Sequence, residues 1–188
     1  MEIHVIPTKL DGAAIVETDF VQDERGFFVE TYHQENYRRH GIVEEFVQDN
    51  HSRSARGVLR GLHYQDLTAP MTKLVRCTAG AILDVAVDLR VGSPTFGQWV
   101  AAELTAENKR QFLVPVGFGH AFLALTDGAE VQYKCSGYYT PSAEGAIRWN
   151  DPDLAIEWPV ADPILSARDR AAMSLQDYLR DPAFRYNG

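Results

Sequence analysis

Short apolar runs, several of them alternating with polar residues, repeat along most of this chain. Between residues 46 and 139 they follow one another, with Gly, Pro, Asn or Asp between most of them. The runs span residues 46–48, 58–65, 73–77, 81–89, 98–104, 111–114, 120–125 and 130–139. The connections are too short for the helices that a parallel βαβ fold requires. The pattern predicts an all-β sandwich or barrel.

The two ends of the chain add a few further elements. Residues 14–16 and 27–32 are strand-like, with a turn sequence at 23–26 between them. Residues 34–40 predict a short helix that ends at a glycine, and a C-terminal helix is predicted from about residue 170 to 179. No repeat or linker divides the sequence, so residues 1–188 are predicted to form a single domain.

The predicted strand at 81–89 has two different faces, because alternate side chains of a strand point to opposite sides. The apolar face carries Leu83, Val85, Val87 and Leu89, and the mixed face carries Ile82, Asp84, Ala86 and Asp88. A mixed face of this kind suits the lining of a cavity, which would place Asp84 inside the protein. The alternative is an acid at a solvated sheet edge.

The predicted strand at 58–65 has polar side chains between its apolar positions. Its sequence, GVLRGLHYQ from residue 57, contains Arg60 and His63. One interpretation is a functional site. The other is a structural strand, with Arg60 on the solvent face and His63 as a hydrogen-bonded core residue. This stretch alone leaves both open.

The composition is that of an ordinary globular protein, with 45% hydrophobic and 23% charged residues. The formal net charge of −8 argues against a nucleic-acid partner, since phosphate backbones are held by accumulated Lys and Arg. Residues 51–76 differ from the rest, with five basic residues and one acid: Arg53, Arg56, Arg60, Lys73 and Arg76 against Asp66. This stretch suits a small multiply charged anion, and a solvated basic surface is the alternative.

Targeting and redox features are few. The N-terminal residues lack the pattern of a signal peptide, and no stretch is long and apolar enough to span a membrane. Cys77 and Cys135 have no metal-like spacing and resemble small buried side chains in a reducing compartment. These features predict a cytoplasmic protein without a membrane partner.

Motifs for several chemistries are missing. The six histidines form no metal-binding motif, and the sequence has no motif for an activated serine, a P-loop or a dinucleotide site. A set of proton-transfer residues on separate predicted elements remains: His63, Lys73, Asp84, His120, Tyr133 and Asp169. A histidine base, a tyrosine acid and a lysine beside an oxyanion suit proton abstraction next to a carbonyl group.

Eight motifs in register carry a resemblance to a known family. They are DERGFF (23–28), FVQDNHS (46–52), GVLRGLHYQ (57–65), KLVRC (73–77), SPTFG (93–97), GFGHAF (117–122), YKCSGYYTP (133–141) and WNDPDLAIEWP (149–159). Together they closely resemble the dTDP-4-dehydrorhamnose 3,5-epimerase family. The resemblance implies a cupin-type jelly roll, also called a double-stranded β-helix, in a homodimer that uses no metal and no cofactor.

The resemblance also implies a reaction. The substrate would be dTDP-4-dehydro-6-deoxy-D-glucose, whose 4-ketone acidifies the C–H bonds at C3 and C5. His63 matches the general base, and Asp169 matches the carboxylate that orients it. Tyr133 matches the acid that returns a proton from the opposite face, and Lys73 matches the group that stabilises the enolate oxygen.

Further residues match family positions that contact the nucleotide-sugar. Within one subunit they are Gln48, Asn50, Ser52, Arg60, Asp84, His120, Tyr139 and Glu144, and from the other subunit Arg25, Phe28 and Glu30. By this resemblance Arg60 holds the diphosphate, Tyr139 stacks on the thymine, and Asp84 pairs with His120. Strand alternation would also place Tyr133 and Tyr139, six residues apart, on one face.

One assignment conflicts with regular strand geometry. Arg60 and His63 are three residues apart and would lie on opposite faces of a regular strand, yet both are assigned to the site. We therefore predict an irregularity at Gly61, a β-bulge, because glycine tolerates the backbone angles that a bulge requires.

Three alternative functions stay open. An epimerase acting at one centre is the closest, and the residues for both proton transfers, His120 included, favour the double reaction. A ketoisomerase on the same barrel is disfavoured by the unbroken set of epimerase motifs. A non-catalytic sugar-binding cupin is disfavoured by His63 and Tyr133, since binding alone needs neither a base nor an acid.

Overall fold

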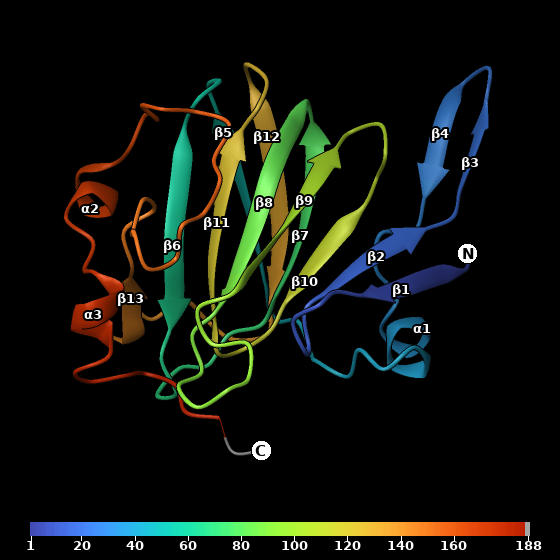
Figure 1. The fold of residues 1–188 in the computed structure, drawn as a ribbon. Coiled ribbons are helices and arrows are strands. Elements are labelled where there is room, and N and C mark those ends of the chain that lie inside the picture. Colours follow the sequence, from blue (N-terminus) through green and yellow to red (C-terminus); the bar gives the residue numbers. More distant parts are fainter. Residues whose placement is uncertain (187–188) are drawn as a thin grey trace.

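The computed structural model describes residues 1–186 and shows two antiparallel sheets that face one another (Figure 1). Across the six-stranded sheet lie β1 (Ile3–Pro7), β2 (Ala14–Thr18), β10 (Gln111–Val114), β7 (Lys73–Ala79), β12 (Ala129–Cys135) and β5 (Gln48–Ser54). Across the five-stranded sheet lie β13 (Glu144–Ala146), β6 (Leu59–Gln65), β11 (Phe118–Ala124), β8 (Ala81–Asp88) and β9 (Trp99–Thr105). The predicted all-β class is confirmed.

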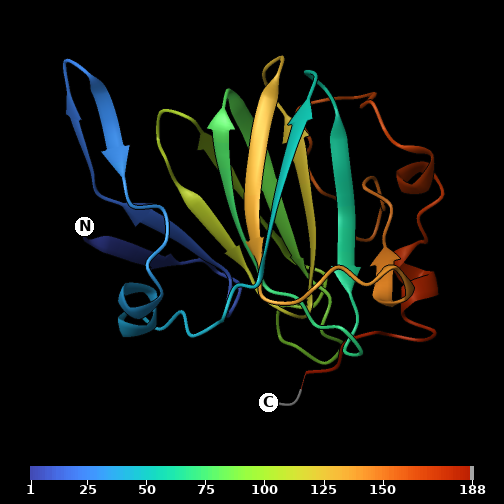
Figure 2. The ribbon, with the colours of Figure 1, turned by 180° about the vertical axis from the view of Figure 1, so that it is seen from behind.

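A hairpin of β3 (Phe20–Asp23) and β4 (Gly26–Val29) projects away from both sheets at the end of the molecule that carries the N-terminus (Figures 1 and 2). The helix α1 (Gln34–Arg39) follows it and confirms the prediction for 34–40. A 3-10 turn (Pro141–Ala143) precedes β13. No helix in residues 1–186 is long and apolar enough to cross a membrane.

Most of the predicted strands are present, but the prediction for residues 46–48 is wrong. The predicted strand at 46–48 is instead β5, which begins at Gln48 and extends to Ser54. Its sequence QDNHSRS has no apolar alternation, and its backbone pairs with β12 over the whole length of both strands. Sheet pairing therefore makes this segment a strand although its composition does not.

The prediction of one C-terminal helix is wrong. The segment forms two single turns, α2 (Ala167–Arg170) and α3 (Leu175–Tyr178). Between them the backbone of Met173 pairs with the main chain of Ala146 and Arg148 at the edge of the five-stranded sheet. These hydrogen bonds require extended backbone there, so a continuous helix cannot form.

The apolar side chains of β8 pack outward and its mixed face points between the sheets. Val85 and Val87 belong to a core that the C-terminal segment covers, whereas Ile82 and Ala86 lie in the core between the two sheets. Asp84 is fully buried beside them. This confirms its predicted inward position and excludes the alternative of a solvated edge.

The irregularity predicted at Gly61 is present in the pairing of β6 with β11. His63 pairs with His120 and Arg60 with Phe122, so the three-residue step on β6 meets a two-residue step on β11. This extra residue is the mark of a β-bulge. Gly61 has a φ of 127°, in the region that favours glycine.

We predict that Gly61→Ala destabilises the protein through contact with β11. An added Cβ would lie against Ala121 and 2.5 Å from the carbonyl oxygen of His120. Gly92→Ala is the matched control, because Gly92 also has a positive φ but no atom within 4 Å of its added Cβ. In urea unfolding, Gly61→Ala should lose about 2 kcal/mol more than the control. Equal losses would show that β11 does not constrain this position.

Candidate active site

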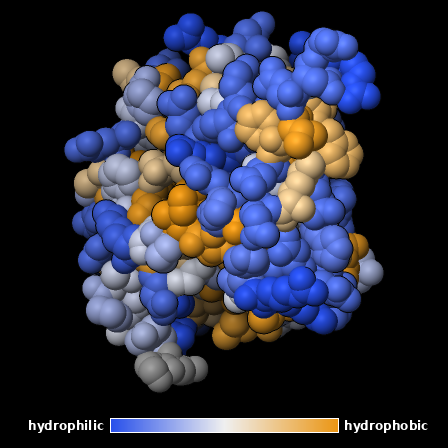
Figure 3. Space-filling view, turned by 90° about the vertical axis from the view of Figure 1, so that its right-hand side faces the viewer, coloured by the Kyte–Doolittle hydropathy of each residue, from blue (hydrophilic) through white to orange (hydrophobic). Residues whose placement is uncertain are grey.

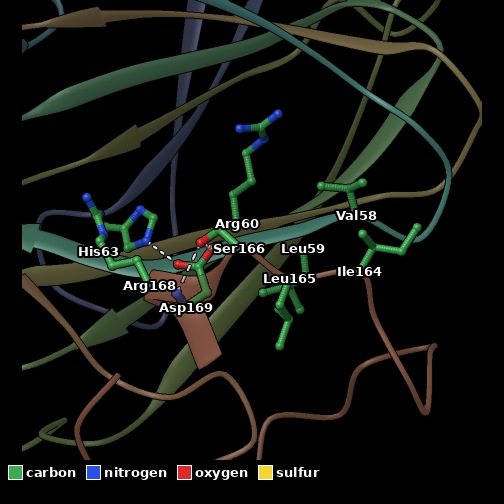
Figure 4. Close-up of a pocket in the computed structure, with 9 residues that line it drawn as sticks. All are labelled: Val58, Leu59, Arg60, His63, Ile164, Leu165, Ser166, Arg168 and Asp169. Atoms are coloured by element: carbon green, nitrogen blue, oxygen red, sulfur yellow. Dashed lines mark hydrogen bonds and ion pairs between the residues drawn. The ribbon is translucent and has the colours of Figure 1, made fainter. Parts of the chain in front are cut away.

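The first element of the site is a histidine–carboxylate pair between β6 and α2. His63 Nε2 lies 2.5 Å from Asp169 Oδ1, and Ser166 Oγ donates to Asp169 Oδ2 at 2.6 Å (Figure 4). Since a carboxylate only accepts, Nε2 carries the hydrogen and the other nitrogen of a neutral imidazole is free to take a proton. The pair therefore has the geometry of an oriented general base.

Local sequence places Asp169 for this contact. Ser166 is the N-cap of α2, and its hydroxyl also accepts from the backbone N–H of Asp169 at 3.1 Å. Burial alone would raise the pKa of Asp169, but the hydrogen bonds from His63 and Ser166 hold it below its usual value. The carboxylate therefore stays charged beside the imidazole.

A second pair, Asp84 and His120, lies deeper between the sheets. His120 Nε2 is 2.7 Å from Asp84 Oδ1, and the two side chains are almost fully buried. Burial lowers the pKa of His120, and the charge of Asp84 offsets part of that shift. Asp84 Oδ2 is buried without a hydrogen-bond partner in residues 1–186, and so is Ser52 Oγ on β5.

The facing sheet contributes a tyrosine and a lysine. Tyr133 on β12 packs against the core between the sheets, and Asn50 is opposite it on β5. The Lys73 ammonium on β7 lies 5.9 Å from the centroid of the Tyr133 ring. Burial raises the pKa of Tyr133 and lowers that of Lys73, whose shift is partly opposed by Cys135 and Asp84.

A cavity of about 410 Å³ joins His63 and Arg60 with the C-terminal segment. The residues that line it are labelled in Figure 4 and include Ile164, Leu165, Ser166, Arg168 and Asp169. The Arg60 guanidinium extends away from the His63–Asp169 pair, and its side chain donates to Ser54 Oγ at 3.2 Å. The bulge thus brings Arg60 and His63 to one cavity.

The loop after β12 carries Tyr139, which is half exposed. Its backbone N–H donates to Gln48 Oε1 at 3.1 Å, and its hydroxyl donates to Glu144 Oε2 at 2.7 Å. Gln48 also donates to Asn50 Oδ1 at 3.0 Å. Strand β12 ends at Cys135, so Tyr139 lies beyond it and is held by these side-chain contacts. The prediction that strand alternation places Tyr133 and Tyr139 on one face is therefore wrong.

Two residues not predicted from the sequence contribute to this arrangement. Ser166 fixes Asp169, and Arg168 forms a two-point ion pair with Glu144. Both flank Asp169 in the segment SARD (166–169). The signal that could have found Ser166 is its place three residues before an acid at a helix start, whereas nothing local to Arg168 indicates its partner.

Three predicted site residues, Arg25, Phe28 and Glu30, do not join the site within this chain. Arg25 pairs with Asp23 at the tip of the β3–β4 hairpin. Phe28 is 65% exposed, and Figure 3 shows an apolar patch over the hairpin. Figure 1 places the hairpin and α2 at opposite ends of the molecule.

The family model described as dTDP-4-dehydrorhamnose 3,5-epimerase matches residues 7–177. A Salmonella typhimurium protein named dTDP-4-dehydrorhamnose 3,5-epimerase is 51% identical over 177 residues, 93% of this chain and 97% of the relative. A Streptomyces niveus protein named dTDP-4-dehydrorhamnose 3-epimerase is 39% identical over 172 residues, covering 91% of this chain and 83% of the relative.

One solved structure has the same fold as this chain over the full length of both. The epimerase of Legionella pneumophila in complex with dTDP-4-keto-L-rhamnose has a TM-score of 0.95 and 47% identity, with 100% of both chains covered. The likeness extends to the whole cupin-type fold, and so confirms the predicted jelly roll.

Proposed function

The chain belongs to the dTDP-4-dehydrorhamnose 3,5-epimerase family, whose reaction it catalyses, and we propose that His63 and Tyr133 carry its proton transfers. The observation that carries this proposal is that His63, paired with Asp169 of α2, lies on one sheet and Tyr133 on the sheet that faces it. Epimerisation requires proton removal from one face of a carbon and proton return to the other. A base and an acid on facing sheets suit that requirement.

The 4-ketone of dTDP-4-dehydro-6-deoxy-D-glucose acidifies the hydrogens at C3 and C5. The free imidazole nitrogen of His63 removes one of them, while Asp169 stabilises the imidazolium that forms. Negative charge then develops on the ketone oxygen, and the Lys73 ammonium stabilises it in a site of low polarity. Tyr133 delivers a proton from the opposite side, which inverts the carbon.

The other residues predicted for the site bind the nucleotide-sugar. Arg60 contacts the diphosphate, since a guanidinium forms paired hydrogen bonds with phosphate oxygens. Tyr139, which is half exposed, stacks on the thymine. Gln48, Asn50, Ser52 and Glu144 contact the nucleotide-sugar, and so does the Asp84–His120 pair, which lies deeper between the sheets.

We further propose a homodimer in which Arg25, Phe28 and Glu30 complete the partner's site. The hairpin that carries Arg25 and Phe28 extends away from its own chain, as Figure 1 shows, and its apolar side chains are exposed. A second copy of this chain would cover these apolar side chains. Arg25 of the first copy would then lie beside the substrate bound by the second copy.

Deuterium incorporation tests the double epimerisation. In deuterated water the protein should introduce deuterium at both C3 and C5 of dTDP-4-dehydro-6-deoxy-D-glucose, because each inversion returns a solvent-derived proton. NMR of the sugar follows each position separately. Deuterium at C3 alone would indicate a single-centre epimerase, the activity named for the Streptomyces niveus relative. A lack of exchange at both carbons would leave only a sugar-binding role.

Two variants test the roles of the base and the acid. His63→Ala should abolish exchange, a loss of about 10²–10⁴-fold or more, since it removes the imidazole that Asp169 orients as the base. Tyr133→Phe should retain exchange but form little epimer, because protons then return only from the side on which they left. NMR of exchange and product in the same sample separates the two effects. Tyr133→Phe with parental epimer yield would contradict the acid role.

Mixed dimers test the sharing of residues between subunits. Co-expressed His63→Ala and Arg25→Gln/Phe28→Ala chains should regain about a quarter of parental activity, because about half of random dimers are mixed and one of their two sites is intact. Each variant alone supplies the inactive control. If one chain provides all residues of its own site, mixing restores nothing.

A further inference from the structure

Arg168 lines the cavity and forms a two-point ion pair with Glu144, and the proposed reaction does not use it. Its Nη1 donates to Glu144 Oε2 at 2.6 Å and its Nη2 to Glu144 Oε1 at 2.5 Å. Two parallel hydrogen bonds between a guanidinium and a carboxylate fix direction as well as distance. Arg168 therefore determines where the Glu144 carboxylate points.

Glu144 in turn holds Tyr139. The Tyr139 hydroxyl donates to Glu144 Oε2, the oxygen that also accepts from Arg168 Nη1. Tyr139 lies outside any strand and its ring is half exposed, so packing alone does not set its orientation. The backbone is held at Gln48 and the far end of the ring at Glu144.

The Glu144 carboxylate depends on Arg168 because its side chain is only 15% exposed. Burial would raise its pKa, but the hydrogen bonds from Arg168 and Tyr139 hold the pKa below its usual value. A largely buried carboxylate that loses a cationic partner either takes up a proton or moves toward water. Either change removes the fixed acceptor for the Tyr139 hydroxyl.

Arg168 also connects Glu144 and Tyr139 to the catalytic base. The segment that carries α2 is anchored by backbone pairing at Ile164 and at Met173, and side-chain contacts to the barrel lie between these points. Adjacent residues make them: Arg168 contacts Glu144 and Asp169 contacts His63. One turn of helix thus reaches both the nucleotide side and the proton-transfer side of the cavity.

We propose that Arg168 is a positioning residue that fixes, through Glu144, the Tyr139 ring on which the thymine of the substrate stacks. This rests on the proposed function. Arg168 acts on substrate binding and not on proton transfer, because Asp169 has its own support from Ser166. The rival role for Arg168 is direct contact with the diphosphate, since it lines the same cavity as Arg60.

The central experiment compares Arg168→Gln with Arg170→Gln. Arg170 lies on the same turn but donates to the Leu165 carbonyl and makes no contact with Glu144. Arg168→Gln should raise KM and the Kd for dTDP roughly tenfold, with kcat changed less than about threefold. Arg168→Lys, which keeps the charge but not the paired hydrogen bonds, should lie between Arg168→Gln and the parent. A fall in kcat at unchanged KM would overturn the proposal.

Two ligands distinguish the rival role. dTDP and dTMP share the thymine and differ in phosphate, so loss of the Tyr139 position weakens both by a similar factor. Isothermal titration calorimetry with each nucleotide measures the two factors. A loss for dTDP that greatly exceeds the loss for dTMP would assign Arg168 to the diphosphate and overturn the positioning role.

A double-mutant cycle tests the route through Tyr139. In a Tyr139→Phe background, which lacks the hydroxyl, Arg168→Gln should weaken dTDP binding by less than about twofold, because the connection is already cut. If the losses of dTDP affinity from the two substitutions are additive, Arg168 does not act through the Tyr139 hydroxyl. Deuterium exchange by the parent protein serves as the separate check on function. If the parent protein exchanges deuterium but Arg168→Gln binds dTDP as tightly as the parent, only this inference is wrong. If the parent protein binds dTDP but exchanges no deuterium, only the proposed function is wrong.

Discussion

The hydrogen bond between His63 and Asp169 joins residues 106 positions apart and connects the barrel to its C-terminal segment. It depends on structure at both ends. His63 needs the strand pairing of β6 with β11, and Asp169 needs the serine cap that begins α2. Because the carboxylate determines which imidazole nitrogen carries the hydrogen, the barrel alone would present a histidine whose basic nitrogen is not fixed. Folding of the C-terminal segment onto the barrel therefore fixes which nitrogen of His63 is basic.

The bulge at Gly61 is the second constraint on this site. In a regular strand, residues three apart face opposite sides, so Arg60 and His63 would lie in different environments. The extra residue on β6 turns one of the two side chains to the same side as the other. Strand β11 approaches Gly61 so closely that no side chain fits at the bulge. One glycine thus allows Arg60 and His63 to line the same cavity.

Sequence alone predicted the features that arise from local patterns. The alternation along 81–89 allowed an inward Asp84, which the structure shows, and the spacing of Arg60 and His63, together with their assignment to one site by the family resemblance, predicted the bulge. The polar strand β5 and the break between α2 and α3 were not predicted, because backbone pairing with distant strands creates both. The pairing of Arg168 with Glu144 was missed for the same reason, since the two residues are 24 positions apart and no periodicity relates them.

The β3–β4 hairpin gives a physical reason for the proposed dimer. An isolated two-stranded hairpin has little stability of its own in water. Here Phe27 and Phe28 are 57% and 65% exposed, and the Lys109 ammonium lies 4.1 Å from the centroid of the Phe27 ring. The same ammonium lies 4.5 Å from the Phe20 ring centroid, but one cation over these two rings leaves much of the apolar surface in water, which is unfavourable by about 25 cal/mol per Å². Burial against a second copy would recover that free energy and would hold Arg25 and Glu30 in place. In this arrangement the surface that stabilises the hairpin and the surface that completes the partner's site are the same.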